Sequence, residues 1–289
     1  MKGILWILMM GALACGMTAQ VAESGAQVDA SGKKRIRLWP IDQVGGEANR
    51  LKQDSEDRGG GKITYRNIKD PNLTVYQVES DRPTPAVIYC PGGAYKQVSV
   101  LQSYIEWLNG MGITVFALNY TVPNDREAAF KDGQRAIRLV RHQASKWNID
   151  PKQIGLIGNS AGGHLVSRLS QNYTTSAYPA LDEADQESSQ PQFVIVVSGA
   201  YYATESPGTE LAEEFHHKHP VAPTLLVYAK DDHNHYPGGL AYARSLKAAD
   251  VSVRMMSYDH GGHGMKGVNW FPKCRKWLKE VGLEVPEDK

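Results

Sequence analysis

Short apolar runs recur along the chain and predict β-strands. The runs at residues 63–68 and 73–78 alternate between apolar and polar positions, which is typical of strands at the exposed edge of an antiparallel sheet. The runs at residues 86–90 and 114–120 are continuously apolar, as strands covered on both faces are. Four more apolar runs follow, at residues 153–158, 193–199, 224–229 and 253–258. Together these runs predict a sheet of eight strands.

Longer mixed segments lie between the later runs and predict helices. Ala136, Ile137 and Val140, for example, recur at helical spacing. The predicted helices are residues 102–109, 125–147, 161–171, 238–249 and 270–281. Strands that alternate with helices favour a mostly parallel sheet with helices on both faces, and the carboxyl ends of such strands carry the active site. The polar segments 173–191 and 202–220 are candidates for a small lid, and are too short for a large cap domain.

Composition and charge narrow the class of protein. The chain has 289 residues, of which 42% are apolar and 22% are charged, as in ordinary globular proteins. The net charge of +1 gives no electrostatic basis for binding nucleic acid or an anionic membrane. Residues 23–62 are polar and rich in Gly, Asp and Lys, and we expect them to form an arm over one catalytic domain at residues 63–289.

Residues 1–22 have the pattern of a secretory signal peptide. A lysine supplies the positive start, residues 4–13 form an apolar run, and small residues follow. The run is too short to cross a membrane, so we expect no transmembrane span in the mature chain. Cleavage is expected near Ala19 or Ala22, and lipid attachment at Cys15 is the alternative. Either outcome predicts an exported protein, periplasmic or extracellular.

The predicted mature chain keeps two cysteines, Cys90 and Cys274. Two cysteines in an exported protein could pair, but they do not make a disulfide scaffold. Cys90 ends an apolar run, and this position favours a small buried side chain. We therefore prefer a packed Cys90 to a bridge between the two cysteines.

Ser160 lies in the pentapeptide GNSAG at residues 158–162, a pattern typical of serine nucleophiles. An apolar run precedes this G-x-S-x-G pattern and a predicted helix follows it. On such a turn the serine hydroxyl is exposed, and the flanking glycines let the strand and the helix pass closely. The helix start adds unpaired N–H groups. We therefore predict that Ser160 is a nucleophile rather than part of an ordinary glycine-rich connection.

Acyl transfer by a serine builds negative charge on a carbonyl oxygen, which backbone N–H groups stabilise. One donor is the N–H after the serine, here Ala161, and the other comes from a glycine-rich loop after an earlier strand. The segment PGGA follows the apolar run that ends at Cys90. We predict Gly93 and Ala94 as donors, with Gly92 shaping the loop.

The serine also needs a general base, and histidine is suited because its pKa lies near neutral pH. A carboxylate then fixes the tautomer of the base. Asp231 and Asp232 follow one apolar run, and His260 and His263 follow the next, in the expected order of acid and base. Adjacent carboxylates cannot both face one histidine. The residues alone leave open which member of each pair points inward.

The segments that carry these residues resemble the esterase/lipase branch of the α/β-hydrolases, particularly small bacterial acetyl esterases. Acetyl-xylan-esterase-like proteins related to bifunctional feruloyl and acetyl xylan esterases belong to this group. The resemblance covers residues 36–283. The segments that carry it are RLWP at residue 37, NLTVYQV at 72, YCPGGAY at 89, LNYTVP at 118, residues 132–165, LLVYAKDD at 225 and YDHGGHG at 258.

This resemblance implies roles for single residues. Ser160 matches the family's nucleophile, Asp232 matches its acid as the second residue of the pair, and His263 matches its base as the histidine followed by glycine. It implies an α/β-hydrolase fold with no metal and no organic cofactor. The chain departs from the family pattern where Ala94 replaces a usual third glycine, and where HNHYP after Asp232 lacks the usual Val-Pro. These departures concern the substrate pockets rather than the triad.

Other histidines need separate interpretations. His216, His217 and His219 form a cluster that we interpret as a solvated segment, because the hydrolase mechanism needs no zinc. His164, on the helix after the serine, is interpreted as a packed histidine.

The expected function is a serine carboxylic-ester hydrolase that acts through an acyl-enzyme. We expect its substrate to be a small-molecule or polysaccharide ester with a short acyl group, acetyl above all, on carbohydrate. The alternatives are a serine peptidase of the prolyl oligopeptidase type, a feruloyl-type esterase, and a binding module on an inactive hydrolase scaffold.

Overall fold

The computed structural model describes residues 27–28, 32–40, 42, 54–215 and 221–285. The predicted signal peptide with Cys15, and the histidine cluster at residues 216–219, lie outside the described residues. Across the ranges just given, the structure contains no helix with the length and apolar character needed to cross a membrane.

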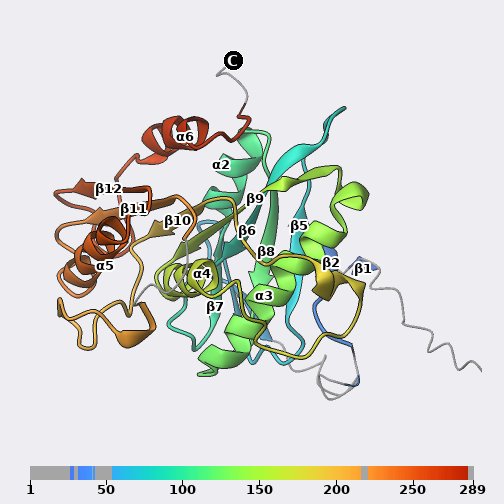
Figure 1. Cartoon of the computed structure of the whole chain (residues 1–289), viewed down its shortest axis with the longest axis horizontal. Coiled ribbons are helices and arrows are strands. Elements are labelled where there is room, and N and C mark those ends of the chain that lie inside the picture. The colour runs from blue at the N-terminus through green and yellow to red at the C-terminus, as the bar shows by residue number, and fades with distance from the viewer. Residues whose placement is uncertain (1–26, 29–31, 41, 43–53, 216–220, 286–289) are drawn as a thin grey trace, which may run out of the picture.

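A nine-stranded sheet forms the centre of the described structure, in the order β1-β2-β5-β8-β6-β9-β10-β11-β12 (Figure 1). Its strands are β1 (Gln27–Val28), β2 (Lys34–Arg37), β5 (Asn72–Tyr76), β6 (Thr84–Cys90), β8 (Thr114–Asn119), β9 (Ile149–Asn159), β10 (Val194–Val197), β11 (Thr224–Ala229) and β12 (Val253–Tyr258). From β8 to β12 every neighbouring pair is parallel, whereas β1, β2 and β5 join antiparallel. The mostly parallel sheet is confirmed, with nine strands among the described residues instead of the predicted eight.

The difference in strand number arises at the N-terminal edge. The alternating run at residues 63–68 forms β4 (Lys62–Arg66), which pairs with β3 (Asp54–Asp57) and β7 (Val98–Leu101) in a separate small sheet. β2 instead pairs with β5 in the main sheet, with β1 outside it, and its Ile36 is buried opposite Leu73. The prediction of exposed edge strands is wrong for both alternating runs, because β4 lies between β3 and β7, and β5 lies largely buried between β2 and β8. Alternation alone does not specify the neighbours of a strand.

The segment expected to be an arm therefore contributes strands to both sheets. β1 and β2 enter the main sheet and β3 enters the small one, although all three precede residue 63. Ile36 and Leu38 supply the apolar face that holds this polar segment against the core. The expected boundary at residue 63 does not separate an arm from the domain.

Among the described residues, five α-helices flank the main sheet, and all five were predicted to within a few residues except at the end of α3. They are α2 (Gln102–Gly110), α3 (Arg126–His142), α4 (Ala161–Gln171), α5 (Tyr236–Ala248) and α6 (Phe271–Glu280). The side chain of Asp125 caps α3 by accepting the N–H of Ala128 at 2.8 Å. The predicted helix to residue 147 ends earlier, and a 3-10 turn, η1 (Ala144–Trp147), continues it.

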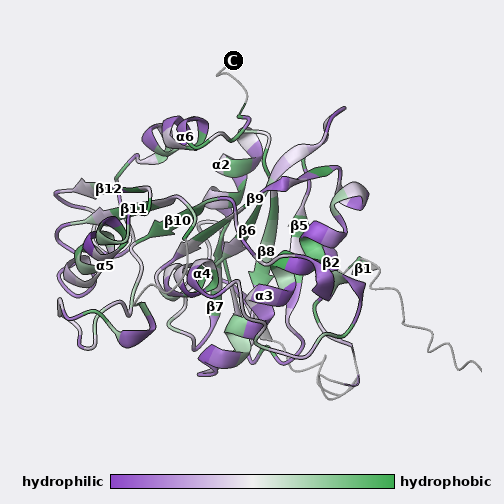
Figure 2. Cartoon of the chain, in the orientation of Figure 1, coloured by the Kyte–Doolittle hydropathy of each residue, from purple (hydrophilic) through white to green (hydrophobic). Residues whose placement is uncertain are grey.

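The helices form two layers, one on each face of the sheet (Figure 1). α2 and α6 pack together through the stacked rings of Trp107 and Phe271, with centroids 4.6 Å apart. On the other face α4 meets α5, where the Gln171 amide donates to the Tyr242 hydroxyl. The central strands are apolar on both faces, and the polar residues lie on the outer faces of the helices (Figure 2). Cys90 and Cys274 are both buried and free.

The two lid candidates are packed against this framework where the structure describes them. In the first segment, Asp182 and Asp185 form ion pairs with the buried Arg135 of α3. In the second, the Tyr202 ring stacks on Tyr242 of α5, with centroids 4.4 Å apart. Neither described segment forms a large cap domain.

Candidate active site

Ser160 lies on the turn between β9 and α4, with φ 54° and ψ −121°. Non-glycine residues rarely adopt this conformation, and the surrounding hydrogen bonds maintain it here. The Ser160 N–H donates to the carbonyl of Val197, and its own carbonyl accepts from the N–H of Ala200. A β-carbon at Gly162 would overlap the carbonyl oxygen of Cys90, so only glycine lets the start of α4 lie so close to the end of β6. The result is a half-buried serine on a turn that backbone hydrogen bonds hold in place.

His263 joins the serine to a carboxylate. Its Nε2 lies 2.7 Å from Ser160 Oγ, and its Nδ1 lies 2.7 Å from Asp232 Oδ2. The three residues follow β9, β11 and β12, so the parallel sheet brings them to one edge. His260, the other candidate base, is exposed on the surface. The structure thus brings together the three residues that the sequence selected.

The ionised state of Asp232 determines which ring nitrogen of His263 carries a proton. Burial acts to raise the pKa of Asp232, but hydrogen bonds from His235 and His263 outweigh it and hold the pKa well below the ordinary 3.8. An ionised carboxylate only accepts, so the Nδ1 of His263 carries a proton. In the neutral ring Nε2 is then the acceptor for the Ser160 hydroxyl. This is the tautomer that a general base requires.

Asp231 has a different task. It is exposed, and its carboxylate accepts the backbone N–H of Gly262 at 2.8 Å and that of Gly261 at 3.2 Å. These glycines stand directly before His263. One carboxylate of the adjacent pair thus holds the loop backbone, and the other holds the imidazole.

The glycine-rich loop after β6 lies beside the serine. A β-carbon at Gly92 would approach Ser160 Cβ to 3.0 Å. The N–H of Gly92 donates to the Asn159 side-chain oxygen at 3.2 Å, which agrees with a role in shaping the loop. Ala94 has φ 56°, a conformation that costs an alanine about 1 kcal/mol more than a glycine. Within the described part of the chain, no acceptor takes the N–H of Gly93 or Ala94.

Three residues shape the site in ways that the sequence analysis did not predict. Asn159 holds the glycine-rich loop, Asp231 holds the histidine loop, and His235 donates to Asp232 at 2.9 Å. The spacing of His235, three residues after the acid at a helix start, is a signal that could have identified it. His164 is a packed histidine as predicted, because it is buried between the Tyr95 hydroxyl and the Glu214 carboxylate.

One group in the described residues has a composition that could hold a metal. Ligand atoms of Asp232, His235 and His263 lie within 4.8 Å of one another. Both imidazoles, however, lie 2.7–2.9 Å from the carboxylate, which is closer than the separation of about 3.3 Å between ligands of a tetrahedral zinc ion. Their rings also contact each other directly, with centroids 4.1 Å apart and planes tilted by 31°. The geometry fits hydrogen bonds better than coordination.

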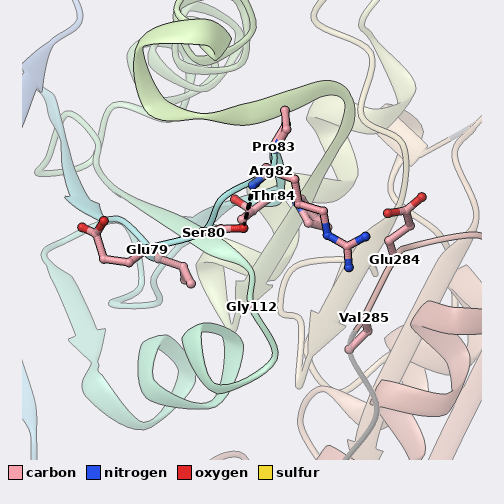
Figure 3. Close-up of a pocket in the computed structure, with 10 residues that line it drawn as sticks. Glu79, Ser80, Arg82, Pro83, Thr84, Gly112, Glu284 and Val285 are labelled. Atoms are coloured by element: carbon pink, nitrogen blue, oxygen red, sulfur yellow. Dashed lines mark hydrogen bonds between the residues drawn. The ribbon is translucent and has the colours of Figure 1, made fainter.

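A hollow of about 470 Å³ lies at the other end of the sheet, where β6 begins. Arg82 and Glu284 face each other across it (Figure 3). Its lining includes neither Ser160 nor His263. Because the strands run away from this end, the hollow is separate from the candidate active site.

A mostly parallel sheet with helices on both faces, and a serine on a strained strand-to-helix turn, define the chain as an α/β-hydrolase. The family model described as BD-FAE matches residues 73–217. The chain belongs to this family, and it is similar to an acetylxylan esterase.

Individual relatives agree with this assignment. The "Acetylxylan esterase" of Xylanibacter ruminicola is 29% identical over 213 residues, which cover 68% of this chain and 44% of the relative. The "Acylamino-acid-releasing enzyme" of Rattus norvegicus is 26% identical over 215 residues, 64% of this chain and 29% of the relative. This chain thus spans less than half the length of either curated relative.

A solved structure is similar over most of the chain. The acetyl ester-xyloside bifunctional hydrolase from Caldicellulosiruptor lactoaceticus has a TM-score of 0.69 and 26% identity. The similarity covers 90% of this chain and 99% of that one.

Proposed function

We propose that the protein is a serine esterase that removes acetyl groups from carbohydrate through an acyl-enzyme. The single observation that carries the proposal is the position of His263, with one ring nitrogen on Ser160 Oγ and the other on Asp232, both at 2.7 Å. A serine hydroxyl is a weak nucleophile until a base takes its proton. This arrangement supplies the base in the tautomer that the reaction needs.

In the proposed mechanism, Ser160 Oγ attacks the ester carbonyl carbon while its proton moves to Nε2 of His263. Asp232 stabilises the imidazolium that forms. The carbonyl oxygen becomes an oxyanion, and the N–H groups of Ala161 and of the Gly93–Ala94 turn are the proposed donors to it. The carbon–oxygen bond of the alcohol then breaks, and His263 returns the proton to the departing alkoxide.

The second half of the reaction releases the acid. Water attacks the acyl-serine carbonyl while His263 takes one of its protons. Collapse of the new oxyanion breaks the bond to Ser160 Oγ, which receives the proton from His263. Acetate and the free enzyme result, and no external oxidant or reductant is required.

The proposed substrate class rests on the names of the relatives. One is an acetylxylan esterase and another is an acetyl ester-xyloside hydrolase, so acetylated xylo-oligosaccharides are the favoured substrates. A hydrolysis screen would compare them with feruloyl esters, simple acyl esters of graded length and N-acetyl peptides. Preference for N-acetyl peptides would instead favour the peptidase alternative, and the similarity to an acylamino-acid-releasing enzyme is the reason to include them. We also propose export, supported by the signal-like residues 1–22.

The mechanism is tested with Ser160→Ala and p-nitrophenyl acetate. This variant should lose activity by at least about a thousandfold and keep its circular dichroism spectrum. The matched control is Ser103→Ala, on the exposed face of α2, which should behave as wild type. His263→Ala should be as inactive as Ser160→Ala, whereas His260→Ala should keep most activity. An active Ser160→Ala protein would exclude the acyl-serine mechanism.

A further inference from the structure

A second imidazole binds the carboxylate of Asp232, on the oxygen that His263 does not use. His235 Nδ1 lies 2.9 Å from Asp232 Oδ1, and His263 Nδ1 lies 2.7 Å from Oδ2. The Asp232 side chain is only 4% exposed, so water has little access to either oxygen. Among the residues that the structure describes, these two imidazoles are the only side-chain or backbone donors to this carboxylate.

Because each oxygen of the Asp232 carboxylate has one donor, Oδ1 depends on His235 for its hydrogen bond. A buried carboxylate oxygen without a donor is costly, because it has given up its hydration without replacement. With His235 absent, Oδ1 would lack any donor, and the carboxylate would turn toward solvent or toward other groups. Such a turn would move Oδ2 away from His263.

The position of His235 is itself well defined. It precedes α5, and its N–H donates to the carbonyl of Asp232 at 3.1 Å, while its own carbonyl accepts the N–H of Gly239 at 2.9 Å. Hydrogen bonds at the start of α5 thus hold the backbone of both Asp232 and His235. His263, by contrast, stands on a loop after two glycines with positive φ, and its side chain is 39% exposed.

The His235 ring also covers one face of the His263 ring. The centroids lie 4.1 Å apart and the planes are tilted by 31°. A ring on a glycine-rich loop has few local restraints, so contact with a ring fixed at a helix start limits its rotation away from Ser160. His235 therefore touches both partners of the acid–base contact.

We propose that His235 is a positioning residue of the active site. It holds Asp232 with one oxygen aimed at His263 and keeps the His263 ring in place over Ser160. This inference rests on the proposed serine mechanism. Its consequence is a loss of turnover, rather than of substrate affinity, when the donor at residue 235 is removed.

Three substitutions separate the contributions of His235. His235→Phe keeps a ring against His263 but has no donor. His235→Asn places an amide N–H at the same distance from the backbone as Nδ1, without a ring. His233→Ala is the matched control, because this neighbouring histidine is exposed.

The expected results concern kcat and KM for p-nitrophenyl acetate. His235→Phe should lower kcat by about 10–100-fold with KM changed by less than about twofold, as expected for a lost hydrogen bond to a charged group. His235→Asn should recover most of that loss, and His233→Ala should match wild type. Recovery by asparagine is the result that a purely structural role of the ring would not give.

A double-mutant cycle completes the test. In an Asp232→Ala background, His235→Phe should cause no further loss, because its effect passes through the carboxylate. An equal loss in both backgrounds, a wild-type kcat for His235→Phe, or an asparagine variant as slow as the phenylalanine variant would each overturn the inference. Failure of the proposed function is distinguishable, since it would appear as activity in Ser160→Ala whatever happens at residue 235.

Discussion

The carboxylate of Asp231 accepts the backbone N–H of Gly262 at 2.8 Å, one residue before His263. The neighbouring Asp232 instead binds the imidazole of that histidine at 2.7 Å. Two adjacent carboxylates, alike in sequence, thus hold the same histidine in different ways. One fixes where its loop runs, and the other fixes how its ring is oriented.

This division predicts unequal effects of removing the two carboxylates. Asp232→Ala should lower kcat by about 10⁴-fold, because the proposed base loses the group that sets its tautomer. Asp231→Ala should lower kcat only about tenfold, because the loop loses hydrogen bonds that are exposed to water. Steady-state kinetics with p-nitrophenyl acetate measure both. Equal losses, or a larger loss for Asp231→Ala, would mean that the carboxylate roles are reversed.

Asn159 should affect turnover through the glycine-rich loop. Its side-chain oxygen accepts the N–H of Gly92 and the hydroxyl of Tyr89. Asn159→Ala leaves the Gly92 N–H without an acceptor, and the loop that supplies the proposed oxyanion donors loosens. We expect kcat to fall about tenfold with KM little changed. Tyr89→Phe, the control, removes the other donor to Asn159 and a weak acceptor of the Leu101 N–H, keeps the Gly92 contact, and should keep kcat within about threefold.

His164 should make stability depend on pH. Burial lowers the pKa of His164 below its ordinary 6.5, although Glu214 acts in the opposite direction. Near pH 6.5 the unfolded chain takes up a proton that the folded chain does not. The free energy of unfolding should therefore fall as pH is lowered through 6.5, by at most about 1.4 kcal/mol per pH unit, and level off below the native pKa.

Urea unfolding at several pH values between about 5 and 7.5 measures this dependence. His164→Gln should flatten the slope, whatever its effect on stability at neutral pH. His142→Gln, at an exposed position on α3, should leave the slope as in wild type. A slope unchanged by His164→Gln would assign the dependence to other groups.

Chelation should leave esterase activity unchanged. In the proposed mechanism the base is His263 and backbone N–H groups stabilise the oxyanion, so no step uses a metal. Protein dialysed against EDTA should keep its rate with p-nitrophenyl acetate to within about twofold. Activity that disappears with EDTA and returns with zinc would instead make Asp232, His235 and His263 candidate ligands.

The main elements of the fold could be predicted because their patterns are local. The continuously apolar runs became the central parallel strands, and β11 and β12 begin and end at the predicted residues. The N-terminal edge could not be predicted in the same way. Strand pairing across a sheet edge depends on distant partners, and β2 joined β5 where the alternating run at residues 63–68 was expected.

Residue types and their positions after strands were enough to identify the candidate nucleophile, the two pairs that contain its partners, and their order along a parallel sheet. Each of these follows from residue type and from the position of a residue after a strand. Residue types and spacing left open which carboxylate binds the base and which histidine reaches Ser160. The family resemblance indicated Asp232 and His263, and contacts in the folded chain join them and add His235 on the second oxygen of Asp232. The physical reason is that the direction of a side chain on a glycine-rich loop is set by contacts across the sheet edge. The opposing roles of Asp231 and Asp232 arise from such contacts, since their local sequences are nearly the same.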